Sequence, residues 1–400
     1  MVPVISTPIP IVGVDVDAVG PVVIEGVTTG QRVWLELNRG GRVVAVVEVT
    51  AEDGGVSEAT LRERIARLSP VSSLAFEVLE DDALPFISVV VPTICGTPAR
   101  LQKAVECLVN LDYPHYEIII VDNRPDPNRQ PLPPFAGGDL VRSFWEPLRG
   151  VSAARNRGIA ETAGDIVAFT DDDVSVDTQW LRELGTRFVL SPEVDAVSGL
   201  VLPLELRTEP QLWFEEYFGG FNQSFDGELL NVDLLADDPL FPYATGRFGA
   251  SCNMAIRAST LERIGDFDVR LGVGTPTHGG EDIDMSMKLI LANGTFAFEP
   301  RAKVRHQHRD SDEQFFTQVF GYGTGLTAMF TKLIVHDPRH LFKMARRFPR
   351  GLRVLLKPRD KRSPSAYATY PRKTYAYHFL GMAYGPFAYA RSVARYRGKR

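Results

Sequence analysis

Three consecutive aspartates, Asp171 to Asp173, follow an apolar run at 166–170. A run of this composition is typical of a buried strand in a parallel sheet. Side chains alternate along an extended backbone, so Asp171 and Asp173 should lie on one side and Asp172 on the other. Two carboxylates on one side suit Mg²⁺ or Mn²⁺ held together with phosphate oxygens. An acidic loop or helix cap would show the same three residues, so the triplet alone leaves both interpretations open.

Two earlier predicted strands, at 87–91 and 117–121, end in residues that could bind a nucleotide. These residues are Thr93, Asp122 and Asn123. Ligands of open α/β sheets collect at the carboxyl ends of strands. The three strand ends therefore predict base and ribose contacts from the first two and a metal and diphosphate at the third. No G-x-G-x-x-G motif follows the first strand and no G-x-x-x-x-G-K-[ST] motif occurs, which disfavours dinucleotide and P-loop sites.

The segments between these strands predict helices. Thr97 and Pro98 are typical of a helix start, and residues 149–158 begin another helix before the aspartates. Strand, helix, strand, helix, strand is the order of a doubly wound α/β sheet with helices on its faces.

The 400 residues divide into three predicted parts. Residues 1–84 form a small β-rich unit with one helix and no visible chemistry, residues 85–335 hold the sheet, and residues 336–400 form a helical tail. The tail carries 17 Lys and Arg against two acids, whereas the first 335 residues carry 27 basic and 48 acidic residues. Charge segregation of this size usually marks a surface for an anionic partner.

Aromatic residues interleave with the charges of the tail, a mixture that suits the anionic inner face of a membrane. No nucleic-acid-binding motif accompanies the charge, so no nucleic acid partner is expected. A tail that packs on its own acidic domain is the alternative. The sequence has no apolar run of 18 residues and no basic leader, so we expect neither a membrane span nor a signal peptide. We expect a cytoplasmic protein, either free or peripheral at the plasma membrane.

Three later stretches carry further candidate residues. Residues 212–221 are unusually aromatic, which fits either stacking on a sugar ring or an aromatic core helix. Gly279 and Gly280 precede Glu281 and Asp282 at a predicted helix start, where acids are ordinarily favourable to the helix dipole. Val304–Arg309 carries two alternating histidines, at 306 and 308, that could face one site.

Four motifs occur in one order: Val91-Pro92-Thr93, Val121-Asp122-Asn123, Arg149-Gly150-x-Ser152-x-Ala154-Arg155-Asn156-x-Gly158, and the aspartate triplet. In this order the chain resembles the family 2 glycosyltransferases over roughly residues 86–330. The resemblance implies a GT-A type fold with a mixed or parallel sheet. It also implies inverting transfer of a sugar from a UDP-, GDP- or dTDP-linked donor. Cys95 and Arg124-Pro125 depart from the ordinary loop residues of the family.

By this resemblance the donor side of the site follows residue by residue. Asp171 and Asp173 would bind the metal, with Asp173 as the direct ligand and His306 completing the shell, while His308 is the close alternative. Arg155 would either face the diphosphate or serve as a structural helix arginine. The nucleotide-sugar contacts are expected from Pro92, Thr93, Asp122, Asn123, Arg155, Asp171 and Asp172.

The resemblance also assigns the acceptor side. Asp282 would deprotonate the acceptor hydroxyl, which is a poor nucleophile until a positioned carboxylate takes its proton. Glu281 would help to hold the acceptor. Further acceptor contacts are predicted from Trp213, Glu216 and His308.

No Gln-x-x-Arg-Trp motif is present, so a single transfer to a glycan or lipid-linked acceptor in cell-envelope polysaccharide synthesis is favoured over processive synthesis. Two other classes stay open. A metal-dependent nucleotidyltransferase would also use paired aspartates, although its Gly-rich loop after the first strand is absent. A non-catalytic protein that binds sugar nucleotides as a scaffold is the third possibility.

Overall fold

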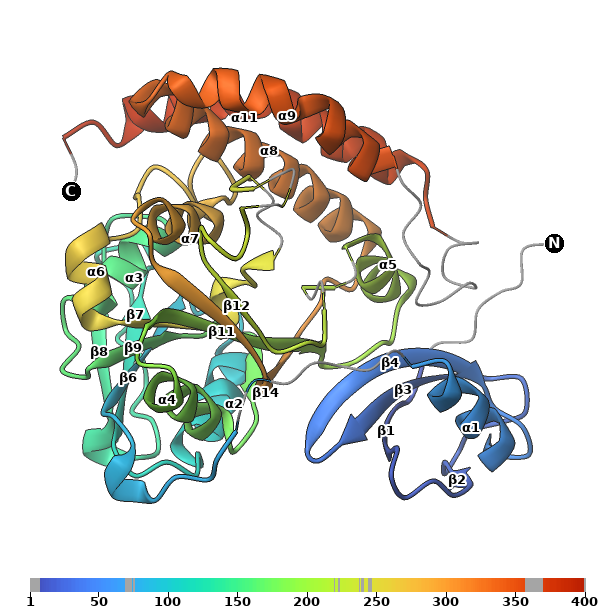
Figure 1. Ribbon diagram of the computed structural model, residues 1–400. Coiled ribbons are helices and arrows are strands. Elements are labelled where there is room, and N and C mark those ends of the chain that lie inside the picture. The colour runs from blue at the N-terminus through green and yellow to red at the C-terminus, as the bar shows by residue number, and fades with distance from the viewer. Residues whose placement is uncertain are drawn as a thin grey trace.

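The computed structural model describes residues 8–68, 74, 76–218, 220–221, 224–236, 238, 241–243, 247–356 and 370–398. Within these residues the main sheet has nine strands in the order β10-β14-β11-β13-β9-β6-β7-β8, with β12 also paired to β14 (Figure 1). The strands are β6 (Ile87–Thr93), β7 (Tyr116–Asp122), β8 (Val141–Trp145), β9 (Ile166–Phe169), β10 (Val174–Val176), β11 (Val194–Pro203), β12 (Glu228–Leu230), β13 (Met254–Arg257) and β14 (Thr295–His306).

The predicted strands β6, β7 and β9 are confirmed, and β7 and β9 both run parallel to β6. The helix α2 (Pro98–Val109) connects β6 to β7, and α3 (Val151–Ile159) precedes β9. Four strands of the main sheet were not predicted, namely β8, which extends the sheet beyond β7, and β10, β12 and β13. Because β13 runs antiparallel to both of its neighbours, the sheet is mixed. The doubly wound α/β class predicted from the sequence is confirmed.

Alternating side chains of the central strands pack into two separate hydrophobic cores, one on each face of the sheet. Val89 and Val91 of β6 belong to the core that includes α2 and α4 (Trp180–Leu190), whereas Val90 faces the core with α6 (Ala258–Ile264) and α7 (Glu281–Leu291). Figure 1 shows these helices on opposite faces of the sheet. Burial on both faces explains why the strands are continuous apolar runs.

The first strands of the chain form their own small sheets. β1 (Ile11–Asp15), β3 (Arg32–Arg39) and β4 (Arg42–Thr50) pair with one another, β2 (Val22–Val23) pairs with β5 (Gly55–Val56), and α1 (Glu58–Ala66) follows.

This N-terminal unit packs directly on the main sheet. Trp34 shares a buried cluster with Leu200 and Phe298, and both nitrogens of the Arg305 fork donate to Glu36, at 2.8 and 2.6 Å. The division of the chain at residues 84 and 335 stays a prediction, since these contacts join the first two parts and α8 (Asp312–His336) runs across the second boundary.

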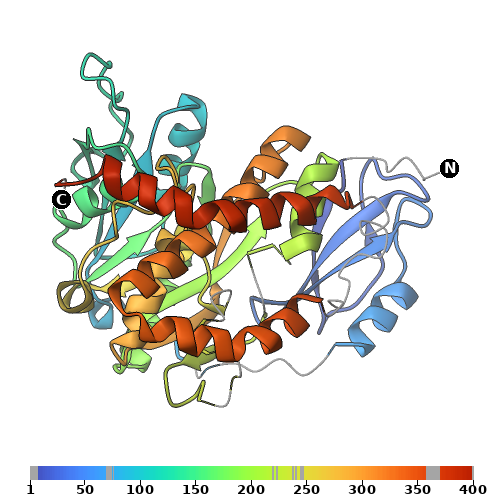
Figure 2. The ribbon, with the colours of Figure 1, turned by 90° about the horizontal axis from the view of Figure 1, so that it is seen from above.

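Three long helices lie along the top of the molecule in the view of Figure 1. They are α8, α9 (Arg339–Leu356) and α11 (Lys373–Arg395), and Figure 2 shows α9 and α11 from above, over the sheet. The glycines at 321, 323 and 325 lie inside α8. No helix of the described residues has the length and hydropathy needed to cross a membrane.

Glycines let these helices approach closely. A Cβ added at Gly323 of α8 would lie 2.2 Å from the carbonyl oxygen of His378 in α11. One added at Gly385 of α11 would lie 1.9 Å from Thr327 Oγ1. On the other side of α8, a Cβ at Gly280, just before α7, would lie 2.5 Å from the Gly325 carbonyl oxygen. Helices α11, α8 and α7 therefore form one tightly packed stack.

Candidate active site

The pairing of β10 with β14 brings a histidine to the aspartates. Val174 of β10 is the register partner of His306, so the residues just before β10 lie beside the end of β14. His306 Nε2 is 3.4 Å from Asp173 Oδ1, and ligand atoms of Asp171, Asp173 and His306 all lie within 4.8 Å of one another. Arg309 Nη2 is 3.8 Å from Asp173 Oδ2.

This group has the donor chemistry of a divalent-metal site. Carboxylate oxygens with one imidazole suit Mn²⁺ or Mg²⁺. Burial lowers the pKa of His306, which favours the neutral ring that can coordinate a metal. Nδ1 of His306 is buried and has no hydrogen-bond partner among the described residues. The three side chains therefore fit the cation that the aspartate spacing predicted.

Asp172 points away from this group, as the alternation of side chains predicted. Its carboxylate accepts a hydrogen bond from the hydroxyl of Thr93, at the end of β6. Burial raises the pKa of Asp172 to about 6, against the effect of that hydrogen bond. Two of the predicted nucleotide-binding residues thus contact each other and join neighbouring strand ends.

Arg155 links the two acidic motifs. Its side chain is 2% exposed, Nη2 donates to Asp171 Oδ1 at 3.0 Å, and Nη1 donates to Glu281 Oε1 at 3.2 Å. The sequence left a diphosphate contact and a structural role open for this residue. In the structure it bridges a candidate metal ligand and the first residue of α7.

Glu281 and Asp282 stand in the first turn of α7. Glu281 is buried, and Asp282 is half-buried with its Oδ1 accepting from the backbone N–H of Ile283 at 2.8 Å. Burial raises the pKa of both carboxyl groups, and their mutual repulsion adds to the effect on Glu281. A carboxylate with a raised pKa is a stronger base, so this pair has the electrostatics of a proton acceptor.

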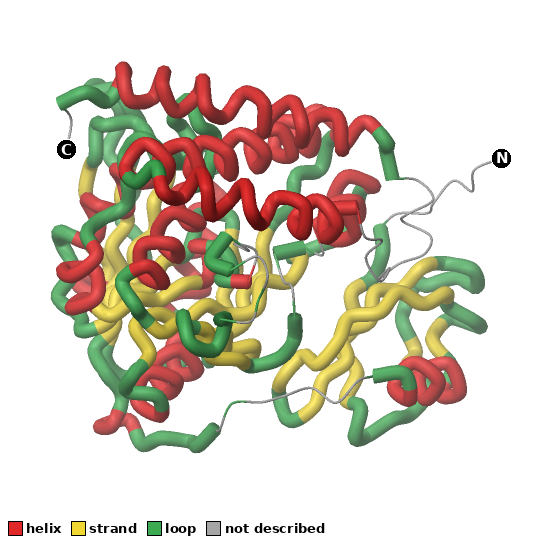
Figure 3. The backbone as a smooth tube through the Cα atoms, turned by 45° about the horizontal axis from the view of Figure 1, so that its top comes forward, coloured by secondary structure: helices red, strands yellow, loops and turns green. Residues whose placement is uncertain are grey.

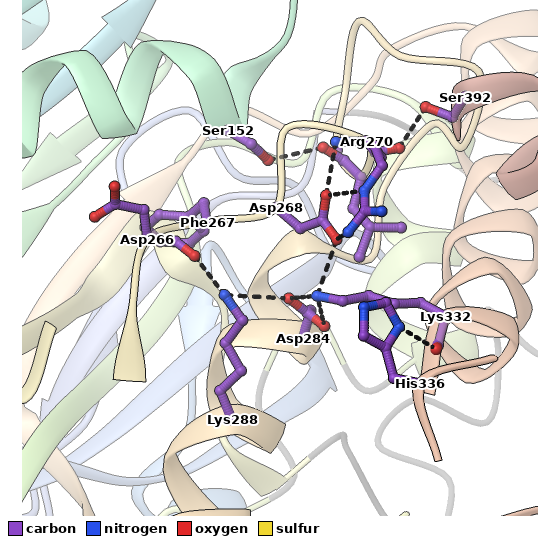
Figure 4. A network of polar contacts seen from close by, with 12 residues as sticks. Ser152, Asp266, Phe267, Asp268, Arg270, Asp284, Lys288, Lys332, His336 and Ser392 are labelled. Carbon is purple, nitrogen blue, oxygen red and sulfur yellow. Dashed lines mark hydrogen bonds and ion pairs between the residues drawn. The ribbon is translucent and has the colours of Figure 1, made fainter. Parts of the chain in front are cut away.

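A buried ion network holds α7 in place (Figure 4). Lys332 Nζ of α8 donates to both oxygens of Asp284, at 2.6 and 2.7 Å, and lies 3.0 Å from Asp268 Oδ2. Burial acts to raise the pKa of Asp268, but hydrogen bonds from Arg270 and Lys332 outweigh it and hold that pKa well below its ordinary value. Ser392 of α11 donates to the Arg270 carbonyl oxygen at 2.6 Å. The network thus ties α8 and α11 to the helix that carries Asp282.

His308, the alternative metal ligand, is engaged elsewhere. Its Nε2 is 2.7 Å from Glu215 Oε1, and both side chains are 2% exposed. Glu215 lies in α5 (Glu209–Phe218) and was not predicted, whereas the side chain of its predicted neighbour Glu216 lies outside the described residues. Trp213 is 7% exposed and packs edge-on against Phe315 of α8, with ring centroids 5.7 Å apart. This is the core position that the sequence had left open.

The end of β7 is occupied by arginines. Asp122 accepts from Arg124 Nε and Nη2, at 2.9 and 2.7 Å, and from Arg129 Nε at 2.7 Å. Burial acts to raise the pKa of Asp122, but these hydrogen bonds outweigh it and lower the pKa. Neither arginine was predicted as a partner of Asp122. An aspartate at the end of a buried strand does need a cation or other donors nearby, and this need was the signal that could have found them.

Asn123 binds the backbone of the loop before α3. Its Nδ2 donates to the carbonyl oxygens of Glu146 and Leu148, at 2.9 and 2.8 Å, and its Oδ1 accepts from Gly150 N at 2.8 Å. These three contacts orient the start of the helix that carries Arg155. Pro92 lies in β6, one residue before Thr93.

Comparison with known proteins identifies the family. The profile described as Glycosyl transferase family 2 matches residues 88–203, and the one described as Glycosyl transferase family group 2 matches residues 166–389, more than half of the chain. The chain belongs to the family 2 glycosyltransferases. The resemblance drawn from the four ordered motifs is thereby confirmed.

The chain is similar to several named members of glycosyltransferase families. It is 30% identical over 176 residues to the pre-mycofactocin glycosyltransferase of Mycobacterium tuberculosis, covering 44% of this chain and 34% of that protein. It is 35% identical over 123 residues to glycosyltransferase AglE of Haloferax volcanii, covering 30% and 40%. The chain thus spans about a third to two fifths of these relatives' lengths. The structure of GalNAc-T7 with UDP, GalNAc and Mn²⁺ gives a TM-score of 0.43 at 18% identity, over 61% of this chain and 48% of that chain.

Proposed function

We propose that this protein transfers a sugar from a nucleotide-diphospho-sugar to an acceptor hydroxyl, with metal dependence and with inversion at the anomeric carbon. One observation carries the proposal. The triad Asp171, Asp173 and His306 is linked through the buried Arg155 to Glu281, beside Asp282. A cation-binding group and a candidate base therefore belong to one connected set of side chains.

The donor would lie at the carboxyl ends of β6, β7 and β9. Asp171, Asp173 and His306 would hold Mg²⁺ or Mn²⁺, which would supply compensation for the charge that develops on the leaving diphosphate. Thr93 and Asp172 stand at the neighbouring strand end, and Asp122 with its two arginines supplies a polar wall for the nucleoside. UDP, GDP and dTDP are the nucleotides to be compared.

The acceptor hydroxyl would lose its proton to Asp282. Its half-buried carboxylate has a raised pKa, so it is both accessible and more basic than an exposed aspartate. The oxygen of the acceptor then attacks the anomeric carbon as the bond to the diphosphate breaks. Glu281 is held by Arg155 and would position the acceptor. A single displacement of this kind inverts the anomeric centre.

We take the acceptor to be a glycan or a lipid-linked sugar of the cell envelope, reached from the inner face of the plasma membrane. The basic, aromatic tail motivates this placement. His308 and Glu215, buried beside His306, are candidates to shape the acceptor side through the aromatic residues packed around them, such as Phe214, whose ring centroid is 4.5 Å from that of His308.

The base assignment is tested by release of nucleoside diphosphate from UDP-, GDP- and dTDP-sugars, with water as the acceptor. Asp282→Asn should reduce release by at least about 100-fold while leaving donor affinity unchanged. Asp266→Asn, a change of the same chemistry at an exposed position, should have no effect. Unchanged release by Asp282→Asn would refute the base assignment. Release of pyrophosphate from a nucleoside triphosphate would instead indicate a nucleotidyltransferase.

The two histidines are distinguished by Mn²⁺ binding. His306→Ala should weaken Mn²⁺ at least about tenfold, since even the outer contacts of metal ligands typically contribute that much. His308→Ala should lower the thermal unfolding temperature, because Glu215 loses its buried partner, but should leave Mn²⁺ affinity within about twofold of wild type. Equal loss of Mn²⁺ affinity in the two variants would contradict the assignment of His306.

A further inference from the structure

The outer face of α11 is apolar over most of its length. Four large side chains on it are strongly exposed: Tyr375 46%, Phe379 51%, Leu380 62% and Phe387 63%. Further residues on the same face are also exposed and carry no charge: Ala376, Ala383, Pro386 and Ala390. The opposite face, with Gly381 and Gly385, packs on α8. A contiguous apolar stripe of this length is unusual on the surface of a monomer.

Helix α9 separates apolar and basic side chains. Leu341 is 51% exposed and Ala345, one turn later, is also exposed. Phe342 is 73% exposed. The exposed Lys343 and Arg346 lie on a different side of the helix from Leu341 and Ala345. A helix with an exposed apolar face beside basic residues is typical of segments that lie in the interfacial plane of a bilayer.

Both helices belong to one side of the molecule. They lie along the top in Figure 1, they face the viewer in Figure 2, and they cross the upper part of the tube in Figure 3. Exposed cations stand at both ends of the stripe on α11: Arg372, Lys373, Arg391 and Arg395. We call this surface, made by the exposed residues of α9 and α11, the α9–α11 face.

We propose that the α9–α11 face docks on an anionic phospholipid bilayer. The apolar side chains would enter the boundary between headgroups and acyl chains, and the flanking cations would meet anionic headgroups. The charge of the face decides between occupants. Its exposed side chains Lys343, Arg346, Arg372, Lys373, Arg391 and Arg395 are all basic, so two copies meeting through this face would bring like charges together.

The face is continuous with the helix stack that supports the candidate base. Helix α11 packs on α8 through Gly381 and Gly385, and α8 packs on the start of α7 at Gly280. Docking would therefore fix the orientation of the whole domain on the bilayer. The docking proposal does not depend on glycosyl transfer, because its test contains no donor and measures only binding.

The test is co-sedimentation of the full chain with vesicles of phosphatidylcholine alone and of phosphatidylcholine with phosphatidylglycerol, at low and high salt. Wild type should bind the anionic vesicles and lose binding at high salt. The triple variant Phe379→Gln/Leu380→Gln/Phe387→Gln should weaken binding at least about tenfold through lost apolar insertion. Lys343→Gln/Arg346→Gln should weaken it about tenfold through lost charge.

The matched control is Val23→Gln/Val78→Gln, which replaces two apolar side chains that are 87% and 78% exposed elsewhere. It should bind as wild type does. Because all the altered side chains are exposed, each variant should keep the wild-type unfolding temperature, and the charge variant tests the face independently if the triple variant does not fold.

Three results would overturn the proposal. The first is a wild-type chain that does not bind anionic vesicles, and the second is a triple variant that binds them as tightly as wild type. The third is a wild-type dimer in light scattering that the triple variant converts to a monomer, without vesicle binding, which would assign the face to a second copy of the chain.

Discussion

Arg155→Met should lower the free energy of unfolding by about 3–5 kcal/mol, the usual cost of removing one partner of a buried ion pair. The guanidinium is 2% exposed and donates to two acids, Asp171 at 3.0 Å and Glu281 at 3.2 Å. Methionine fills much of the space but leaves both carboxylates without their cation. The same substitution should weaken Mn²⁺-dependent donor binding, because Asp171 loses the contact that orients it.

The cost should increase with pH. Burial already raises the folded-state pKa of Glu281 above its unfolded value, so its protonated form favours folding. That contribution is present below the unfolded pKa and is lost as the pH rises through the folded pKa. Removing Arg155 raises the folded pKa further. The difference between wild type and variant should therefore be smaller at pH 5 than at pH 8.

Urea unfolding followed by tryptophan fluorescence, without metal, measures both effects. Arg157→Met is the matched control, since it lies two residues later in α3 and makes a partly exposed i, i+4 pair with Glu161, worth about 0.3–0.5 kcal/mol. Arg155→Met/Glu281→Gln should recover part of the loss. An Arg155→Met variant no less stable than the control, or a cost that does not change with pH, would refute the bridging role.

Two further substitutions test the support of α7. Lys332→Met should lower the free energy of unfolding by about 3 kcal/mol or more, because Asp268 and Asp284 lose their shared cation; urea unfolding measures it. Gly385→Ala should lower the thermal unfolding temperature by several degrees, because the added Cβ would lie 1.9 Å from Thr327 Oγ1 and cost about 1–3 kcal/mol; differential scanning calorimetry measures it.

These two predictions have controls of the same chemistry. Lys103→Met removes an exposed lysine of α2, and Gly20→Ala adds a Cβ with nothing within 4 Å. Both controls should remain close to wild type. A Lys332→Met variant as stable as Lys103→Met would contradict the role of the network. A Gly385→Ala variant as stable as Gly20→Ala would contradict the close packing of α8 and α11.

The strands that could be predicted are those buried on both faces. Ile166–Phe169 and the apolar runs before Thr93 and Asp122 have side chains in two cores, so the sequence shows them as continuous apolar segments. Val141–Trp145 was missed because it is a short strand at the edge, half-buried, with a charged residue and a serine inside it. β13 was not predicted as a strand, and since a sequence pattern gives no strand direction, its antiparallel course could not be predicted either.

Within the candidate site, the sequence predicted those side-chain directions that depend on a single segment of the chain. The alternation of Asp171 to Asp173 follows from an extended backbone, and in the structure Asp172 points away from the other two as expected. Its contact with Thr93 was not predicted. The choice between His306 and His308 depends on the register of β10 against β14, which no local pattern encodes. Glu215 was missed for the same reason, because its partner is a histidine brought to it by the fold.

The central claim is tested most directly by calorimetric titration of UDP, GDP and dTDP into the wild-type chain, with Mn²⁺ and with a chelator. One nucleotide should bind in the presence of Mn²⁺, bind at least about tenfold more weakly without it, and lose that dependence in Asp173→Ala. The exposed Asp139→Ala should behave as wild type. Binding that is equal with and without Mn²⁺, or unchanged in Asp173→Ala, would contradict a metal-assisted donor site at the end of β9.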